Sequence, residues 1–284
     1  MNADPKVSIH PDSTLLAATV AARLITRLVD VQNERGSATV VLTGGSLGTA
    51  ALAAVAASPA CSAVDWSRVD FWWGDERFLS ASDPDRNAVQ ARQALLGELG
   101  LAESQIHEFG SSDGFPDQDA AAADYATRLQ DAADAERALA DDTSDSVSPS
   151  DSDGQDTRLP RFDVLLLGVG PDAHIASLFP EMPGIRTKEQ TVVGVAGAPK
   201  PPPLRMSLTL EAVNSAQEIW IAAGGQDKAG AVGLALAGAG PAQVPAAGAR
   251  GRRKTLWLID QEAAAQLPGR LIASDDSDDE DSDN

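Results

Sequence analysis

The side chain best placed for chemistry in this sequence is a histidine that follows a long apolar run. His174 comes after that run and a glycine-rich turn, in "FDVLLLGVGPDAH". Such a turn would present the imidazole at the mouth of a crevice, where it could act in chemistry near pH 7. Asp172 and Asp163 are the nearby acids that could orient the ring. The alternative is that His174 caps the helix that "IASLF" begins.

The other two histidines have less informative surroundings. His10 lies in a polar N-terminal stretch before Pro11, and His107 lies in "ESQIHEF", a short amphipathic run. A histidine in such a run is more often structural than catalytic. We therefore expect His107 to be a surface or half-buried structural residue.

The segment "VVLTGGSLGTA", residues 40–50, is compatible with two kinds of site. It contains the G-x-S-x-G pattern of a hydrolase nucleophile between an apolar run and an alanine-rich run, which would make Ser46 the attacking group. The same turn, with Thr43, Gly44 and Gly45, would also leave backbone N–H groups free to bind a phosphate at a helix N-terminus. Ser46 would then be only a phosphate ligand.

Three cationic side chains lie in or next to predicted strands. Arg77 comes shortly after Asp75 at the end of one strand. Arg205 lies in "LRMSLTL" after a proline-rich turn, and Lys228 follows two glycines. Phosphate recognition combines backbone N–H groups with arginine forks and a lysine point charge. Together with the glycine-rich turn, these residues predict an anion site.

Strands and helices alternate along the chain, which predicts an α/β fold. The predicted strands are at residues 38–42, 69–77, 162–170, 191–195, 204–210, 218–225 and 254–260. The predicted helices are at 14–36 after a cap at Asp12 or Ser13, 47–58, from about 85, 120–140, 226–236 and 261–267. We expect a mostly parallel sheet flanked by helices, with its ligand beyond the carboxyl ends of the strands. "TGGS", "GDER", "GVGPDAH" and "GGQDK" all fall at such ends.

The net charge of −20 is concentrated in two segments. Residues 141–157 carry six acids and residues 274–284 carry seven, with no base in either, so the remainder carries −7. Both segments lack the apolar side chains that would offset the entropy of ordering. We expect one α/β domain over residues 1–273, with a disordered acidic insertion at about 141–157 and a disordered acidic tail whose partner is unknown.

Composition also argues against several classes of protein. An acidic chain repels nucleic acid and anionic membranes, so we expect neither as a partner. Cys61 is the single cysteine, and the sequence has neither paired-histidine metal spacing nor a nucleotide-binding glycine motif. We expect no metal and no cofactor. No apolar run approaches membrane-spanning length and no secretory leader is evident, which predicts a cytoplasmic protein.

These motifs together resemble those of the 6-phosphogluconolactonases, which hydrolyse 6-phospho-D-glucono-1,5-lactone to 6-phospho-D-gluconate in the oxidative branch of the pentose phosphate pathway. The resemblance extends from the first helix to about Ile272, without the acidic segments. "FDVLLLGVGPDAHIASLFP" is similar to the family signature G-x-G-x-D-G-H-x-A-S-L-F-P. The segments "WWGDERF", "DPDRNA", "RMSLTL" and "GGQDK" occur in the family's order and spacing. Ala173 replaces the usual glycine, and a positive φ would cost more there.

The resemblance implies a fold and a role for each candidate residue. The family shares an α/β superfamily with glucosamine-6-phosphate deaminase and ribose-5-phosphate isomerase. His174 would be the general base, and Asp75 and Arg77 would surround the lactone. The turn from Thr43 to Ser46, together with Arg205 and Lys228, would surround the phosphate.

Three alternatives stay open from the sequence. In the related deaminases the histidine is followed by Phe-Asn-Glu-Pro, which supplies a glutamate for ring opening, whereas this chain has "SLFP" at residues 177–180. A serine hydrolase would use Ser46, Asp163 and His174 in that chain order. A sugar-phosphate sensor would bind without turnover, but no DNA-binding segment is evident.

Overall fold

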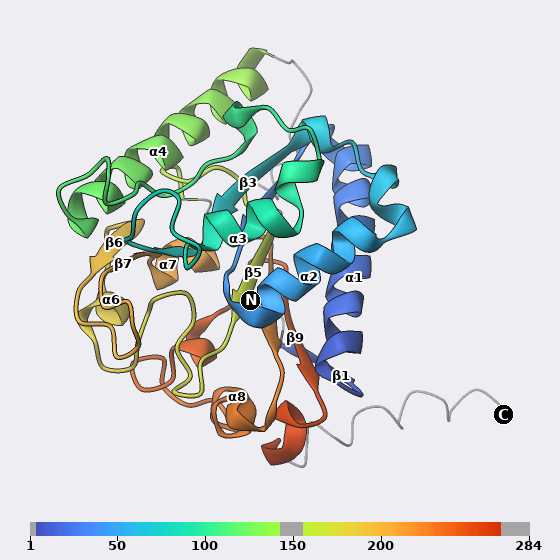
Figure 1. Ribbon diagram of the computed structural model, residues 1–284, viewed down its shortest axis with the longest axis vertical. Coiled ribbons are helices and arrows are strands. Elements are labelled where there is room, and N and C mark those ends of the chain that lie inside the picture. Colours follow the sequence, from blue (N-terminus) through green and yellow to red (C-terminus); the bar gives the residue numbers. More distant parts are fainter. Residues whose placement is uncertain (1–3, 143–155, 268–284) are drawn as a thin grey trace, which may run out of the picture.

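The centre of the molecule is a six-stranded parallel sheet in the order β1-β9-β8-β5-β2-β3 (Figure 1). The computed structural model describes residues 4–142 and 156–267, with the side chains of 140–142 left out. The strands are β1 (Lys6–His10), β2 (Ala38–Leu42), β3 (Val69–Trp73), β5 (Val164–Gly168), β8 (Glu218–Ala223) and β9 (Lys254–Asp260). The predicted mostly parallel α/β fold is therefore confirmed.

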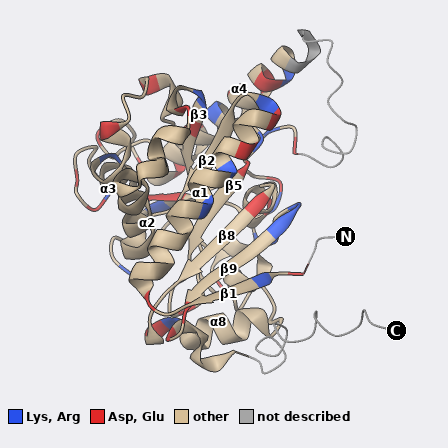
Figure 2. Cartoon of the chain, turned by 90° about the vertical axis from the view of Figure 1, so that its right-hand side faces the viewer, with Lys and Arg blue, Asp and Glu red and all other residues tan. Residues whose placement is uncertain are grey.

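Helices flank this sheet. They are α1 (Ser13–Arg35), α2 (Gly45–Ala57), α3 (Asn87–Ala94), α4 (Gln118–Asp142), α6 (Pro183–Arg186), α7 (Leu210–Asn214) and α8 (Ala229–Leu236). The residues predicted to start and end the first helix do so in the structure. The Asp12 carboxylate accepts the N–H of Leu15 at 2.8 Å, and Gly36 ends the helix with φ 85°. Figure 2 shows α1 and α2 together on one side of the sheet.

Short 3₁₀ helices complete the connections. They lie at Pro59–Ala63, Trp66–Arg68, Leu96–Glu98, Glu103–Gln105, Gln226–Lys228, Pro245–Gly248 and Ala263–Gln266. The predicted helix at 261–267 is only the last of these, and the predicted helix at 226–236 begins with one before α8. The predicted acidic insertion begins inside the last turn of α4, and its centre at 143–155 and the acidic tail lie outside the described residues.

A second, three-stranded antiparallel sheet, in the order β4-β7-β6, lies on the side of the main sheet away from α1 (Figure 1). It consists of β4 (Asp75–Arg77), β6 (Val192–Val195) and β7 (Arg205–Leu208). The single strand predicted at 69–77 is therefore wrong. The chain passes from the main sheet to the small one at Gly74, whose N–H donates to Leu42 and whose carbonyl accepts from Leu208.

The strand β1 was not predicted. It pairs with β9 at the edge of the main sheet, and most of its side chains are half-buried or exposed, so it lacks an apolar pattern. His10 lies at its end and forms hydrogen bonds with Ser8 and Thr19. The expected polar N-terminal stretch is thus an edge strand whose partner lies about 250 residues further along the chain.

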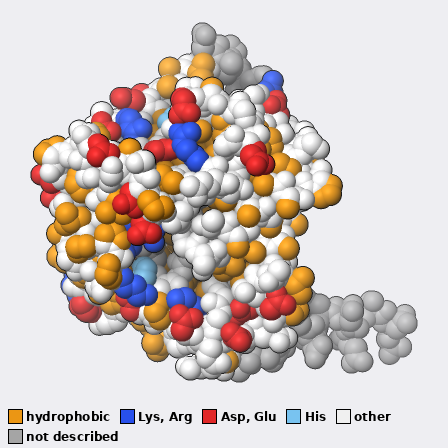
Figure 3. Space-filling model, in the orientation of Figure 1, with side chains coloured by type: hydrophobic (Ala, Val, Ile, Leu, Met, Phe, Trp, Pro, Cys, Tyr) orange, Lys and Arg blue, Asp and Glu red, His pale blue; other side chains and the backbone are white. Residues whose placement is uncertain are grey.

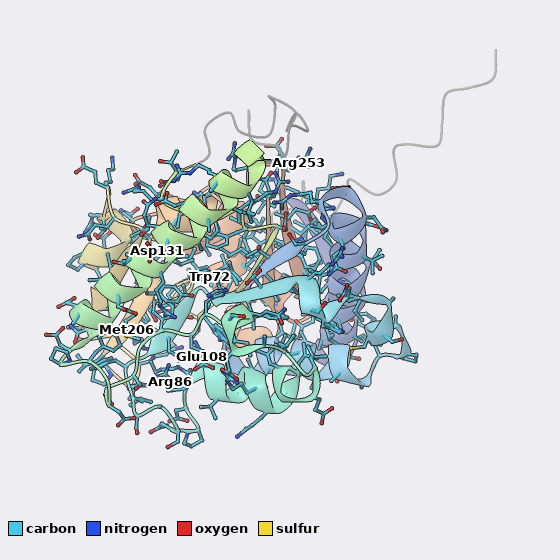
Figure 4. The ribbon with its side chains drawn as sticks, turned by 90° about the horizontal axis from the view of Figure 1, so that it is seen from above. Trp72, Arg86, Glu108, Asp131, Met206 and Arg253 are labelled. Atoms are coloured by element: carbon cyan, nitrogen blue, oxygen red, sulfur yellow. The ribbon has the colours of Figure 1, made fainter. Side chains whose placement is uncertain are left out.

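The helix α4 packs beside β3 through aromatic side chains. Trp72 lies under this helix in Figure 4, and its ring meets the Tyr125 ring edge-on at 5.5 Å. The Tyr125 hydroxyl donates to the Trp73 carbonyl and accepts the Trp73 N–H. Burial raises the pKa of Tyr125 well above its usual range. In the described part of the chain, no helix is long and apolar enough to cross a membrane.

Candidate active site

The four glycine- or acid-containing motifs at strand ends meet because their strands are neighbours. β8, β5, β2 and β3 are consecutive in the sheet, so the loops after their carboxyl ends lie side by side. They surround a cavity of about 260 Å³. Figure 3 shows a hollow on this face with a histidine in it and Lys and Arg side chains around it. The cavity is lined by Thr43, Gly44, Gly45, Asp75, Arg77, Asn87, Gly168, Val169, Gly170, His174, Ala176, Lys200, Pro201, Arg205 and Lys228.

The loop after β5 holds His174 against an acid. The Nδ1 atom of His174 lies 2.5 Å from Oδ1 of Asp172. Burial opposes the ionisation of Asp172, but its hydrogen bond to His174 and the charge of that ring outweigh burial and lower its pKa to about 2. A Cβ on Gly170 would lie 2.0 Å from the imidazole, so glycine is required there. Ala173 has φ 67°, the positive value that the usual glycine of the signature predicted.

The turn after β2 leads directly into α2. Gly44 precedes the helix, and Gly45 begins it with φ 83°, a value that favours glycine. Thr43, Gly44 and Gly45 line the cavity. Ser46 lies in the first turn of α2 with an exposed side chain and is not among the lining residues. Among the described contacts, no hydrogen bond joins Ser46 to His174.

The segment after β3 brings an acid and a cation to the cavity. Asp75 is 6% exposed, and its Oδ2 accepts the Ser177 hydroxyl at 2.7 Å. Arg77 donates through Nη1 to the carbonyl of Asp85. Its Nε is buried without a hydrogen-bond partner among the described residues. One guanidinium donor of a residue that lines this cavity is therefore left without a partner in the described part of the chain.

Two further cations come from β7 and from the loop after β8. Arg205 is 6% exposed and donates to the carbonyls of Lys200, Pro201 and Pro202 at 3.0–3.2 Å. It thereby holds the loop that carries Lys200 to the cavity. Burial lowers the pKa of Arg205, and the neighbouring Arg77 lowers it too, against the opposing charge of Asp75. Lys228 also lines the cavity and forms an ion pair with the exposed Asp227 at 2.8 Å.

Three residues at this site had no role assigned from the sequence: Lys200, Asn87 and Ser177. Lys200 lies in the proline-rich turn "PKPPP", which gave no signal of its own. Asn87 lies in "DPDRNA" and Ser177 in "HIASLFP", so both belong to motifs that the resemblance already singled out. The Ser177 hydroxyl donates to Asp75, which lines the cavity.

Asp163 does not belong to this site, which corrects the expectation that it could orient His174. It directly precedes β5 and so lies at the opposite, amino-terminal end of that strand. Its carboxylate is fully buried and bound to Arg35, Arg161 and the N–H of Thr39. The sequence of acid and histidine gave the right chain order for a triad, but a five-residue strand separates the two groups.

His107 is structural, as expected. Its Nε2 lies 2.9 Å from Asp70, and its ring stacks on Trp72 with centroids 4.0 Å apart. This second histidine–aspartate pair lies outside the lining of the cavity. Its existence shows that such a pair alone does not define an active site.

A larger cavity, of about 790 Å³, lies elsewhere, between α4 and β6. It is lined by residues of α4, of β6 and of the segment 183–191, including the acids Asp119 and Glu189, and its one cation, Arg158, is already paired with Asp156. It contains no histidine. The smaller cavity is the candidate active site because it combines an oriented imidazole with unpaired donors. The described residues contain no cluster of acids, cysteines and histidines suited to a metal ion.

Comparison with known proteins places the chain in a family. The model of the glucosamine-6-phosphate isomerases/6-phosphogluconolactonase family matches residues 11–257. The 6-phosphogluconolactonase of Streptomyces coelicolor is 54% identical over 95% of this chain and 98% of its own length. That of Mycobacterium tuberculosis is 42% identical over 92% of this chain and 98% of its own length. The chain belongs to the glucosamine-6-phosphate isomerase/6-phosphogluconolactonase family.

Solved structures share the fold. The crystal structure of a devB protein superposes with a TM-score of 0.73 at 26% identity, covering 93% of this chain and 99% of that one. A 6-phosphogluconolactonase from Trypanosoma brucei gives 0.73 at 24% identity with the same coverage. A monomeric glucosamine-6-phosphate deaminase of the NagB superfamily gives 0.68 at 18% identity, covering 92% of this chain and 99% of that one. These superpositions show that the chain shares the fold of these proteins.

Proposed function

We propose that this protein hydrolyses 6-phospho-D-glucono-1,5-lactone to 6-phospho-D-gluconate. The observation that carries the proposal is the His174–Asp172 pair facing a cavity that four cationic side chains also line. The relatives that match nearly the whole chain at 54% and 42% identity are named 6-phosphogluconolactonases. A phosphorylated substrate is a dianion that does not cross membranes unaided, so we place the reaction in the cytoplasm.

His174 is the general base in this proposal. Asp172 accepts a hydrogen bond from Nδ1–H of His174. This bond fixes the tautomer and leaves the lone pair of Nε2 to take a proton from water. A lactone is already an activated ester, so this water can attack C1 without a covalent intermediate. The tetrahedral adduct then collapses with cleavage of the bond from C1 to the ring oxygen, which receives the proton that His174 took from the water. The unpartnered Nε–H of Arg77 would stabilise the oxyanion that develops on the lactone carbonyl. Asp75 lies beside it and limits the positive charge at this side of the cavity.

The phosphate would lie between the glycine turn and the lysines. Backbone N–H groups at the start of α2 carry the positive end of the helix dipole, and Lys200 and Lys228 add point charges. Arg205 acts here through its remaining N–H groups and through the loop that it holds. Binding the remote phosphate would orient the sugar so that C1 meets the activated water.

The proposal is tested by following the disappearance of freshly prepared 6-phosphogluconolactone with and without protein. The parallel measurement uses the unphosphorylated gluconolactone, and the spontaneous rate is subtracted from both. We expect a large acceleration with the phosphorylated lactone and a far smaller one without the phosphate. A rate equal to the spontaneous one would reject enzymatic hydrolysis and favour a sugar-phosphate sensor. Ammonia release from glucosamine 6-phosphate would favour the deaminase, and we expect none.

A further inference from the structure

We propose that the side-chain carbonyl of Asn87 accepts a hydrogen bond from a ring hydroxyl of the lactone and so determines substrate specificity. This inference rests on the proposed function and extends it to a residue that had no role assigned from the sequence. Asn87 begins α3 and lines the cavity, yet it is only 3% exposed. Its Oδ1 has no hydrogen-bond partner among the described residues. A buried acceptor without a partner is rare, because it loses its hydration without compensation.

The orientation of the Asn87 amide follows from its other contacts. Nδ2 donates to the carbonyl of Asp75 at 2.9 Å and lies 3.4 Å from the Asp75 carboxylate. A flipped amide would place its oxygen against these two acceptors, which is unfavourable. The amide nitrogen therefore faces Asp75, and the oxygen is the atom left without a partner.

The chemistry of the cavity decides what this oxygen can bind. A carbonyl oxygen needs a donor, and neither an ionised phosphate nor the lactone carbonyl has a hydrogen to donate. The ring hydroxyls of the lactone do. The cations that line the cavity are better matched to the anionic and carbonyl groups of the same ligand, so cations and Asn87 recognise different parts of it.

The position of Asn87 is held from both sides. The buried Glu76 carboxylate accepts the N–H groups of Asn87 at 2.7 Å and Ala88 at 2.9 Å, and thereby caps α3. Arg86 lies 3.7 Å from the same carboxylate and donates to the Phe109 carbonyl, and Figure 4 shows it next to the segment of Glu108. On the other side, a Cβ on Gly44 would lie 1.9 Å from Asn87 Oδ1. Glycine at position 44 leaves the space that the amide oxygen occupies.

The test compares the parent lactone with its 2-deoxy, 3-deoxy and 4-deoxy analogues, all phosphorylated at C6. For the wild-type protein we expect kcat/KM to be about tenfold lower on one analogue than on the parent. In Asn87→Leu, which has a similar volume and no acceptor, this ratio should fall to about one. A role that is only structural would lower the rates on all four lactones by the same factor and leave the ratio unchanged, which would overturn the inference.

A second variant tests the same contact by changing Gly44 instead of Asn87. Gly44→Ala leaves Asn87 in the sequence but displaces its amide oxygen, so the ratio should again fall toward one. Gln90→Ala, one turn further along α3, is the matched control and should keep the wild-type ratio, because Gln90 donates only to the Pro84 carbonyl. Retention of the ratio in both Asn87→Leu and Gly44→Ala would reject the inference while the proposed function stands. Wild-type protein inactive on the parent lactone would reject both.

Discussion

Two sets of buried side chains, one at each end of the parallel sheet, differ in whether the protein itself supplies their hydrogen-bond partners. At the amino-terminal end, the fully buried Asp163 is bonded to Arg35, Arg161 and the backbone of Thr39. At the carboxyl-terminal end, Arg77 Nε and Asn87 Oδ1 are buried at a cavity without described partners. The first arrangement has its partners within the protein, and we propose that a ligand supplies the partners of the second.

This difference indicates which buried groups stabilise the fold and which bind substrate. A buried ion pair whose partners are all present costs several kcal/mol to break, because an uncompensated charge remains. Donors and acceptors held in place without partners lower stability but are already oriented for a ligand. Substitutions at the two ends should therefore separate stability from activity.

The largest expected effect is on catalysis at the carboxyl-terminal end. His174→Ala should lower kcat/KM for the phosphorylated lactone by about 10²–10⁴, because the water loses its base. His107→Ala removes the other histidine–aspartate pair and should keep the wild-type kcat/KM. Rates are measured by lactone disappearance. Wild-type turnover in His174→Ala would show that another group activates the water.

The next effect is on stability at the amino-terminal end. Asp163→Ala should lower the free energy of unfolding by about 3–5 kcal/mol, since it leaves Arg35 and Arg161 beside an empty buried site. Removing the exposed Asp134, paired with Arg137 on α4, should change it by less than about 1 kcal/mol. Chemical denaturation measures both. An Asp163→Ala protein that unfolds like wild type would contradict the assignment of stability to this end.

Removing a lysine should also have different effects on the kinetics at the two ends of the sheet. Lys228→Ala should lower kcat/KM by about 10- to 150-fold, mainly through KM, because a charge-assisted phosphate contact is worth about 1.5–3 kcal/mol. Lys254→Ala, at the amino-terminal start of β9, should leave both constants unchanged. Steady-state kinetics with the phosphorylated lactone measures kcat and KM for the two variants. Equal kinetics in the two variants would mean that the phosphate is held elsewhere.

The pairing of Asp172 with His174 predicts a dependence of stability on pH. The folded-state pKa of about 2 lies below the ordinary value of 3.8, so the ionised Asp172 stabilises the fold above pH 4, and this contribution is lost as the pH falls toward 2. Because a third of this side chain is exposed, we expect about 1–2 kcal/mol. Asp172→Asn should lack this loss. Parallel stability curves for the two proteins between pH 4 and pH 2 would refute it.

The smallest effect is expected at Ser46. Its exposed hydroxyl can supply at most one neutral contact to the phosphate, worth about 0.5–1.5 kcal/mol, so Ser46→Ala should raise KM modestly and keep most of kcat. A fluorophosphonate should leave the protein unlabelled, as judged by intact mass. Stoichiometric labelling of Ser46, or a variant as inactive as His174→Ala, would favour the serine hydrolase.

Local patterns in the sequence predicted much of the fold and part of the site. The bounds of α1, the buried strands and the strand-end position of His174 depend on neighbouring residues alone. Hydrophobic period, caps and glycine turns act over a few residues, so a single stretch of chain suffices to predict them. The contact between His174 and Asp172 is equally local, since the two are two residues apart, but the sequence left Asp163 open as the orienting acid.

The remaining features depend on contacts between distant segments. β1 was missed because its order comes from β9, and the strand at 69–77 divides because β4 pairs with β7 rather than with the main sheet. Ser177 reaches Asp75 across 102 positions of sequence, and the amide oxygen of Asn87 lies where a side chain on Gly44 would be. The sequence by itself determined which residues stand at strand ends. Only the tertiary structure decided which strands are neighbours and at which end each group lies, because the direction and order of strands in a sheet are set by packing of the whole chain.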